Sequence, residues 1–560
     1  MRSFLHKAKD AIHETLHDHS TPTQHTVQRQ QVPMTSQDPN YCALPSAPTS
    51  NDVFRYRYQH GTNLGSIFVL EKWLSGSMFP SNATAQQSSE LEAVKASVSA
   101  IGLNATRAKW EQHWQSAISD SDFSWLVNSA SCTSIRLPVG YFTLGPHFCK
   151  STPFEPYASV YTNAWSIVKS IVSSCHSHGI GVLLDLHALP GGANTGDHSG
   201  TNSGIAALWG NQANLDLATK CLAYMAQEIR NVPLDGVIGL QICNEAEYNA
   251  PGMYSWYDTV IAQTCSIDPS IPLYISDSWD LSQCISYTLG KNSSNSAAAA
   301  TNPVIIDTHY YWAFSDANKA MSPQQIIADV SNKMTELDGK DGSIVDRGAV
   351  QVVVGEYSCV MDGSSWSKAG GGDRGELVKQ FGNAQSNRWQ QRAGGSFFWT
   401  YKMDWMPGGD WGFVQQCTPN TTPPPPPSPS PAVYPPWNLT LSPSDVSSRV
   451  STAQSQQDNS RVVAVQQHTD YWNQTAPGQN FGHWRFEAGW KLGFSDAISF
   501  FSARSNSLLG PLLAGGDKIG CLEVWIHKRL GETGQVGDFL WEWEQGFRRG
   551  VSDFYGLAGV

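Results

Sequence analysis

The chain has few of the features that mark membrane, secreted or nucleotide-binding proteins. No apolar run among its 560 residues approaches the length of a membrane span, and the first ten residues contain no continuous apolar stretch typical of a secretion signal. We therefore expect a cytoplasmic protein without a transmembrane segment. Mitochondrial or peripheral membrane association is the alternative, and a monomer is expected.

Cysteine spacing and charge exclude further classes of protein. The eleven cysteines are an odd number and show neither a disulfide framework nor a zinc-binding spacing, and no glycine-rich phosphate loop follows the first predicted strand. A net charge of −12 repels phosphate backbones. These features predict no metal, no cofactor and no nucleic-acid partner.

Aromatic residues are abundant instead. The 21 tryptophans, 19 tyrosines and 21 phenylalanines exceed the usual needs of packing. Most are expected in the core, and the remainder offer flat faces that suit the apolar faces of sugar rings.

The composition divides the chain into four segments. Residues 1–52 are polar and are predicted to be disordered, although Leu5, Ala8, Ile12 and Leu16 have the spacing of a short amphipathic helix. Residues 53–418 are predicted to form the main domain, and residues 419–437 a proline-rich linker. Residues 438–560 are predicted to be a helical extension that packs on the main domain and supplies its last helix.

Short apolar runs alternate with longer helical patterns in the main domain. This alternation predicts a parallel sheet, and eight repeats favour a closed (β/α)8 TIM barrel over an open doubly wound sheet. The predicted strands are Asn63–Leu70, Ser134–Leu137, Ile180–Leu186, Val237–Cys243, Leu273–Ser276, Val304–Thr308, Val350–Val354 and Ser396–Thr400.

Polar residues end six of these runs. In such a barrel they would converge on the carboxyl-terminal mouth. Glu245 ends the fourth run and Glu356, 111 residues later, ends the seventh, so their carboxylates would face each other across the barrel axis. The other strand-end residues are Arg136, His187, Asn244, His309, Tyr311 and Trp399.

Two facing carboxylates can cleave a glycosidic bond by double displacement. One carboxylate attacks the anomeric carbon while the other protonates the leaving oxygen, so their pKa values must differ. We expect Arg136 to keep Glu356 ionised, and we expect a raised pKa for Glu245.

These residues lie in segments that resemble glycoside hydrolase family 5 of clan A, and especially the fungal exo-β-1,3-glucanases. The resemblance spans about residues 56 to 405. The matching segments are Gly61–Trp73, Ile135–Tyr141, Asp185–Gly192, Asn244–Glu245, His309–Tyr311, Val354–Ser358 and Phe398–Lys402.

The resemblance implies that Glu245 is the acid/base and Glu356 the nucleophile. It also implies that a subsite for the terminal glucose is shaped by Glu71, Arg136, His187, Asn244, His309, Tyr311 and Trp399. Glu71, placed at the end of the first strand, would bind hydroxyls of the non-reducing end and favour exo action.

The chain departs from that pattern after the third strand. The loop Ala193–Gly200 lacks the aromatic residue that helps to clamp the next sugar in secreted members, whereas the other half of the clamp, Phe314, is present. The missing signal and the long tail suggest an intracellular branch of the family.

The expected function is therefore a retaining exo-acting β-glucosidase or glucan 1,3-β-glucosidase. One alternative is a glucosylceramide or steryl-β-glucoside hydrolase, with an apolar entrance built by Trp312, Phe314 and Trp405. The alternative from another class is a catalytically silent carbohydrate-binding scaffold.

Overall fold

The computed structural model describes residues 45–84, 88–232, 234–293, 301–340, 342, 344–418 and 431–560. The predicted helix through Leu5, Ala8, Ile12 and Leu16 and most of the predicted linker lie outside these residues. Within the described residues, each helix is too short or too polar to cross a membrane.

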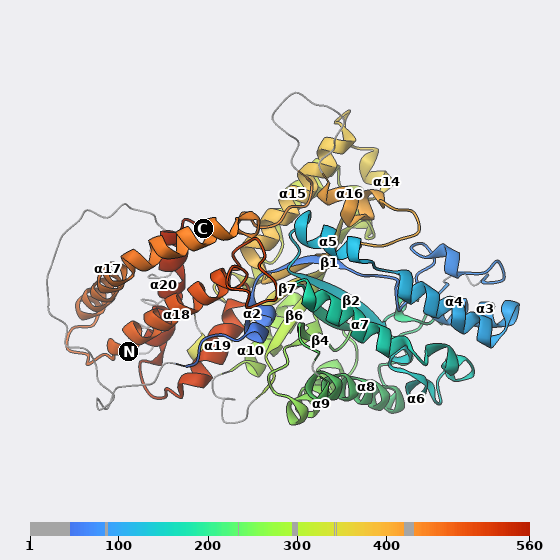
Figure 1. Cartoon of the computed structure of the whole chain (residues 1–560), viewed down its shortest axis with the longest axis horizontal. Coiled ribbons are helices and arrows are strands. Elements are labelled where there is room, and N and C mark those ends of the chain that lie inside the picture. Colours follow the sequence, from blue (N-terminus) through green and yellow to red (C-terminus); the bar gives the residue numbers. More distant parts are fainter. Residues whose placement is uncertain are drawn as a thin grey trace.

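Eight parallel strands close into a barrel in sequence order, with β1 paired to β8. Figure 1 shows the strands at the centre of this part of the chain, with helices around them. The predicted barrel is confirmed. The strands are β1 (Gln59–Asn63), β2 (Ser134–Gly140), β3 (Gly181–Ala188), β4 (Val237–Gln241), β5 (Leu273–Ser276), β6 (Val304–Trp312), β7 (Val352–Met361) and β8 (Gly395–Phe398).

Helices connect successive strands on the outside of the barrel. Several begin at side-chain caps, as when Asp280 and Asp373 accept hydrogen bonds from the first turns of their helices. The longer helices are α3 (Glu90–Ile101), α4 (Leu103–Ser116), α5 (Asp120–Asn128), α7 (Ala164–Ser177), α8 (Gln212–Asn231), α9 (Met253–Ile267), α10 (Leu281–Lys291), α12 (Pro323–Asp329) and α15 (Arg374–Arg392). The shorter ones are α6 (Pro146–Cys149), α11 (Asp316–Ala320), α13 (Ile344–Arg347), α14 (Gly363–Trp366) and α16 (Phe413–Cys417).

The first strand lies earlier in the chain than predicted. Asn63–Leu70 was expected to be the strand, but β1 ends at Asn63 and the apolar residues after it form a buried turn. Gly61 allows β1 to approach β2, because a Cβ at this position would lie 1.7 Å from the Ser134 carbonyl oxygen. Glu71 therefore follows a loop and does not end a strand.

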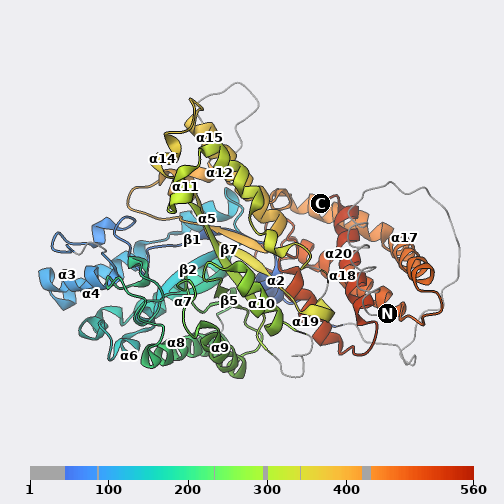
Figure 2. The same cartoon turned by 180° about the vertical axis from the view of Figure 1, so that it is seen from behind.

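The C-terminal region forms a helical bundle at one end of the molecule, opposite α3 and α4 (Figures 1 and 2). Its helices are α17 (Pro443–Thr475), α18 (Trp484–Ser502), α19 (Leu522–Thr533) and α20 (Leu540–Ala558). The long helix α17 begins at a reciprocal capping box formed by Ser442 and Asp445, with Pro443 in the first turn.

This bundle packs on the amino-terminal end of the barrel. There α2 (Ser50–Tyr56) lies between the strands and the bundle, and the ring of Tyr56 is 5.1 Å from that of Trp525. One buried apolar cluster joins all three parts: Leu183, Ile238, Tyr274, Ile305 and Val353 of the barrel, Val53, Phe54 and Tyr56 of α2, and Phe500, Cys521, Val524 and Trp525 of the bundle.

The contacts of the bundle thus lie at the end of the barrel opposite the mouth. The predicted segment boundaries, and the prediction that the tail supplies the last barrel helix, stay predictions.

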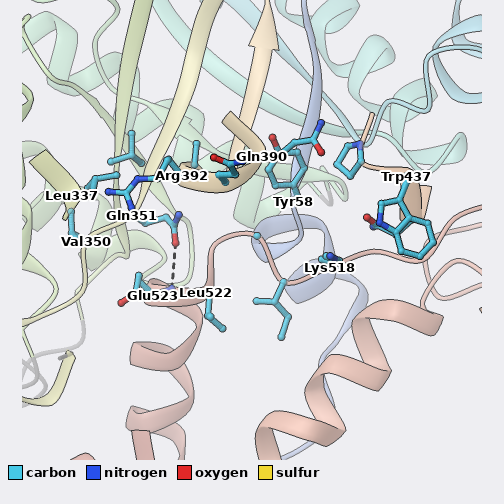
Figure 3. Close-up of a pocket in the computed structure, with 17 residues that line it drawn as sticks. Tyr58, Leu337, Val350, Gln351, Gln390, Arg392, Trp437, Lys518, Leu522 and Glu523 are labelled. Carbon is cyan, nitrogen blue, oxygen red and sulfur yellow. Dashed lines mark hydrogen bonds between the residues drawn. The ribbon is translucent and has the colours of Figure 1, made fainter. Parts of the chain in front are cut away.

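A cavity of about 510 Å³ lies at this junction, between the beginnings of the strands and the bundle (Figure 3). Its wall includes Tyr58 and Gln351 from the barrel and Lys518 and Glu523 from the bundle. The backbone N–H of Glu523 donates a hydrogen bond of 3.3 Å to Gln351 Oε1, so polar contacts also connect the two parts.

Candidate active site

Polar side chains from six strands or their following loops meet at the carboxyl-terminal mouth of the barrel. The parallel strands place these ends together, and the two-residue period of a strand directs alternate side chains inward. Arg136 comes from β2, His187 from β3, Asn244 and Glu245 from the segment after β4, His309 and Tyr311 from β6, Glu356 from β7 and Trp399 from the segment after β8.

Arg136 is fully buried and organises the centre of the site. Its Nη1 donates to Glu356 Oε1 at 2.8 Å, and its Nη2 donates to Asn244 Oδ1 at 2.7 Å and lies 2.9 Å from Asp185 Oδ2. Burial lowers the pKa of Arg136, but the carboxylates of Asp185, Glu356 and Asp307 outweigh that effect and raise it. The guanidinium is therefore a permanent positive charge beside Glu356.

Glu356 receives a second hydrogen bond on its other oxygen. The hydroxyl of Tyr311 donates to Glu356 Oε2 at 2.9 Å, and His309 Nδ1 lies 3.7 Å from the same oxygen. These hydrogen bonds fix the orientation of the Glu356 carboxylate.

Glu245 follows β4 in a left-handed backbone conformation, with φ of 42°. This conformation is uncommon for residues other than glycine and often occurs at functional sites. His309 Nδ1 donates to Glu245 Oε1 at 2.8 Å, and His198 Nε2 lies 3.1 Å from Glu245 Oε2. Each carboxylate oxygen of Glu245 thus faces an imidazole.

The pKa of Glu245 differs from the expectation. Burial raises this pKa, but the neighbouring imidazoles of His198 and His309 outweigh burial and lower it well below its usual range. The predicted raised pKa of Glu245 is therefore wrong for the free protein. Burial lowers the pKa of His198, yet the carboxylate of Glu245, 3.1 Å away, and the charges of Glu71 and Glu356 raise it to about 9.

The two glutamates face each other closely. A carboxylate oxygen of Glu245 and one of Glu356 lie within 4.8 Å of each other, and His309 Nδ1 approaches both residues. Retaining glycosidases have carboxyl groups about 5–5.5 Å apart, whereas inverting enzymes need a wider gap for water. The geometry can perform a double displacement.

His187, Asn244 and Trp399 form one wall of the site. His187 Nδ1 donates to Asp185 Oδ2 at 2.7 Å, and its Nε2 lies 3.4 Å from Asn244 Nδ2. The rings of His187 and Trp399 stack with centroids 5.8 Å apart. The wall therefore holds an aromatic face and the fixed amide of Asn244, next to Glu245 in the chain.

Glu71 reaches the same site from the loop after β1. It is 6% exposed, and Trp73 Nε1 donates to its Oε2 at 2.9 Å. Ligand atoms of Glu71, Asp197 and His198 lie within 4.8 Å of one another. Burial raises the pKa of Glu71 to about 7, against the lowering effect of His198.

Exposed aromatic residues surround the mouth. Phe314 is 62% exposed and lies 5.6 Å from the ring of Tyr311, and Trp405 is 43% exposed and lies 6.3 Å from that of Trp73. Trp312 was expected in this entrance, but it is buried and its Nε1 donates to Asp329. That expectation is wrong, because Trp312 points outward from β6 into the helices, where it packs on Phe381.

The sequence reasoning missed four polar residues of the site. Asp185 and Asp307 precede His187 and His309 by two residues, so the strand period placed them on the same inward face. Gln241 lies on β4 and accepts from Arg136 Nε at 2.8 Å. No periodic signal marks His198, because it comes from the loop after β3.

Comparisons with known proteins point to one family of enzymes. A model of the cellulase family, glycosyl hydrolase family 5, matches residues 91–391, and a model of the glucan 1,3-beta-glucosidase 3 C-terminal domain matches residues 453–558.

The chain is also similar to curated fungal proteins. It is 30% identical to an uncharacterized glycosyl hydrolase of Saccharomyces cerevisiae, over 91% of this chain and 94% of that protein. It is 31% identical to glucan 1,3-beta-glucosidase 3 of Schizosaccharomyces pombe, over 88% and 94%. A probable glucan 1,3-beta-glucosidase A of Aspergillus clavatus is 28% identical, over 62% and 84%.

The family model matches more than half of the chain. The two relatives that are at least 30% identical align over 94% of their own length. The chain belongs to glycoside hydrolase family 5 and is a glycoside hydrolase.

Proposed function

We propose that this protein is a retaining exo-acting β-glucosidase that removes terminal glucose from β-1,3-linked glucans or related β-glucosides. The observation that carries the proposal is the approach of Glu245 and Glu356 to within 4.8 Å across the mouth of the barrel. The names of the relatives from Schizosaccharomyces pombe and Aspergillus clavatus support the β-1,3 linkage.

Glu356 has the surroundings of a nucleophile. Arg136 and Tyr311 each donate to one of its oxygens, so the carboxylate is held in one orientation beside a positive charge. Glu356 would attack the anomeric carbon and form a covalent glycosyl–enzyme intermediate. Glu245 would protonate the leaving oxygen and then activate the water that releases glucose.

The polar wall and Glu71 support exo action. Glu71 and Asn244 offer oxygen and nitrogen atoms to sugar hydroxyls, while Trp399 offers a flat face to the ring. A terminal glucose bound this way would end against the loop after β1. Only the non-reducing end of a chain would then fit.

A glycoside substrate panel tests the proposal. Wild-type protein is expected to hydrolyse aryl β-glucosides and β-1,3-linked oligosaccharides, with β-glucose as the first product in proton NMR. Glu356→Ala is expected to lose activity by at least about 10³-fold, and azide is expected to restore turnover by forming an α-glucosyl azide. Glu336→Ala changes an exposed glutamate outside the site and is expected to keep wild-type activity.

Two results would contradict the proposal. Formation of α-glucose as the first product would mean inversion. No turnover of any β-glycoside by the wild type would favour the carbohydrate-binding scaffold instead.

A second candidate function is hydrolysis of glucosylceramide or steryl glucosides. The exposed rings of Phe314, Trp73 and Trp405 at the mouth favour it, because apolar faces beside a sugar site suit an amphiphilic leaving group. Micellar assays that compare lipid glucosides with laminari-oligosaccharides separate the two candidates by kcat/KM. Trp405→Ala is expected to reduce only the lipid activity if this candidate is correct.

Cytoplasmic location and a monomeric state remain our predictions. Fractionation of cells and light scattering of the purified protein test them.

A further inference from the structure

His198 contacts the candidate acid/base directly, although it comes from a loop outside the strands. It lies in the short helical turn Asp197–Ser199 after β3, and its side chain is 26% exposed. Its Nε2 is 3.1 Å from Glu245 Oε2. The other carboxylate oxygen, Glu245 Oε1, accepts a hydrogen bond from His309. His198 therefore contacts the oxygen that His309 does not.

The loop is tied to the backbone around Glu245. The side chain of Asn194 donates to the Glu245 carbonyl oxygen at 3.0 Å, and the Glu247 N–H donates to the Ala193 carbonyl oxygen at 3.1 Å. Asn194 also accepts from Gly196 N at 2.9 Å, which shapes the turn before His198. The imidazole and the carboxylate are therefore held in register by the backbone as well as by their own contact.

The groups that face His198 are mostly acidic. Glu245 lies after β4, Glu71 comes from the loop after β1, Glu356 comes from β7, and Asp197 is its neighbour in the turn. The ring of His187 on β3 is 5.8 Å away. This surrounding negative charge favours a protonated His198, whose Nε2 lies 3.1 Å from Glu245 Oε2.

We propose that His198 is a positioning residue that stores the proton which Glu245 delivers to the leaving group. This inference rests on the proposed function. His198 passes the proton from Nε2 to Glu245 Oε2 and becomes neutral, and its partly exposed ring moves aside for the glycosidic oxygen.

The proton is conserved over the two chemical steps. In the first step, Glu245 gives it to the glycosidic oxygen while the bond from that oxygen to the anomeric carbon breaks, with the electron pair staying on oxygen. Glu356 forms the new bond to carbon. In the second step, water gives its oxygen to carbon and a proton to Glu245, the bond to Glu356 breaks with its electron pair returning to the carboxylate, and the proton returns to His198.

Two substrates distinguish this role from a structural one. A 2,4-dinitrophenyl β-glucoside has a leaving group that needs no proton, whereas a methyl β-glucoside or laminaribiose needs one. For methyl β-glucoside or laminaribiose, His198→Ala is expected to lower kcat/KM about 10- to 100-fold, less than the loss expected when a general acid is removed entirely. For the dinitrophenyl glucoside, the expected loss is less than about threefold. His147→Ala, an exposed histidine on α6, is the matched control and is expected to behave as wild type.

The pH profile gives the second measurement. In the wild type, the alkaline limb of kcat/KM for laminaribiose reports loss of the stored proton. In His198→Ala the proton binds Glu245 alone, so this limb is expected to move to lower pH by at least one unit. His198→Asn keeps a polar side chain without a titrating proton and is expected to show the same shift.

Equal losses on both substrates, or an unchanged alkaline limb, would overturn the role of His198 while leaving the proposed function intact. Failure of the wild type to hydrolyse the dinitrophenyl glucoside would instead contradict the proposed function itself.

Discussion

At the scale of single residues, the site depends on acids whose surroundings differ sharply. Glu245 is held ionised by two imidazoles and Glu356 is bonded by Arg136 and Tyr311, whereas burial raises the pKa of Glu71 to about 7. Three carboxyl groups in one pocket thus have three different environments, which is what the proposed acid, nucleophile and binding roles require.

The raised pKa of Glu71 predicts a pH dependence of sugar binding. Ionised Glu71 accepts hydrogen bonds from hydroxyls more strongly than the acid does, and it ionises as pH rises through about 7. The inhibition constant of glucose is therefore expected to fall between pH 5.5 and 8. Glu71→Gln is expected to raise this constant about tenfold at pH 8 and to remove its pH dependence.

Glu90→Gln provides the control for that measurement. Burial also raises the pKa of Glu90 to about 7. The carboxylate of Glu90, however, accepts hydrogen bonds from Trp110 and Tyr161 and from the Leu70 N–H of the loop after β1. It is expected to keep the pH dependence. A flat wild-type profile would contradict the role of Glu71.

At the scale of elements, α18 and α20 cross closely because glycines line their contact. A Cβ on Gly489 would lie 2.0 Å from the Trp543 carbonyl oxygen, and one on Gly546 would lie 2.0 Å from that of Phe486. Backbone contact at this distance leaves no room for a methyl group.

Gly489→Ala is therefore expected to destabilise the protein. Separating two packed helices should cost about 1–3 kcal/mol and lower the melting temperature by several degrees. Gly556→Ala lies in α20, where no atom comes within 4 Å of the place its Cβ would take, and is expected to raise stability by about 0.4–1 kcal/mol. Differential scanning calorimetry measures the melting temperature of both variants. Equal melting temperatures would contradict the close contact of α18 and α20 at Gly489.

Sequence patterns predicted some strands with their observed bounds and others with wrong bounds. The central strands have continuous apolar runs bounded by polar residues, and Leu273–Ser276 was predicted with its observed bounds. The prediction of the first strand was wrong because Leu64–Leu70 is as apolar as a strand but forms a buried turn. An apolar run is typical of a buried strand and of a buried turn alike.

The site was predictable where it follows strand ends. Glu245 and Glu356 meet as expected, since the barrel brings the ends of β4 and β7 together. His198 and the low pKa of Glu245 were not predictable, because both depend on how a loop folds back over the mouth. Local sequence carries no periodic signal for that contact.

At the scale of the whole molecule, the bundle and the barrel share one buried surface. Tyr274 and Val353 of the barrel, Phe54 of α2 and Trp525 of the bundle belong to the same apolar cluster. Arg57 adds a buried ion pair to Asp517, 3.5 Å away, across this junction.

Removal of residues 438–560 is therefore expected to leave an insoluble barrel. The deletion would expose the apolar side chains of α2 and of the barrel that the bundle covers, and it would remove the acid that pairs with Arg57. Soluble yield and size-exclusion chromatography measure the outcome. Val536→Ala, at a residue 79% exposed in the bundle, is the control and should remain soluble.

The packed amino-terminal end of the barrel limits how molecules enter and leave the site. Arg136 and its neighbours fill the barrel interior beneath the two glutamates, and the bundle covers the opposite end. The departing aglycone and the incoming water must then use the same opening. A sugar or alcohol present at high concentration would compete with water for the glucosyl–enzyme intermediate, so a glucosidase built this way is expected to synthesise new glycosides as well as to degrade them.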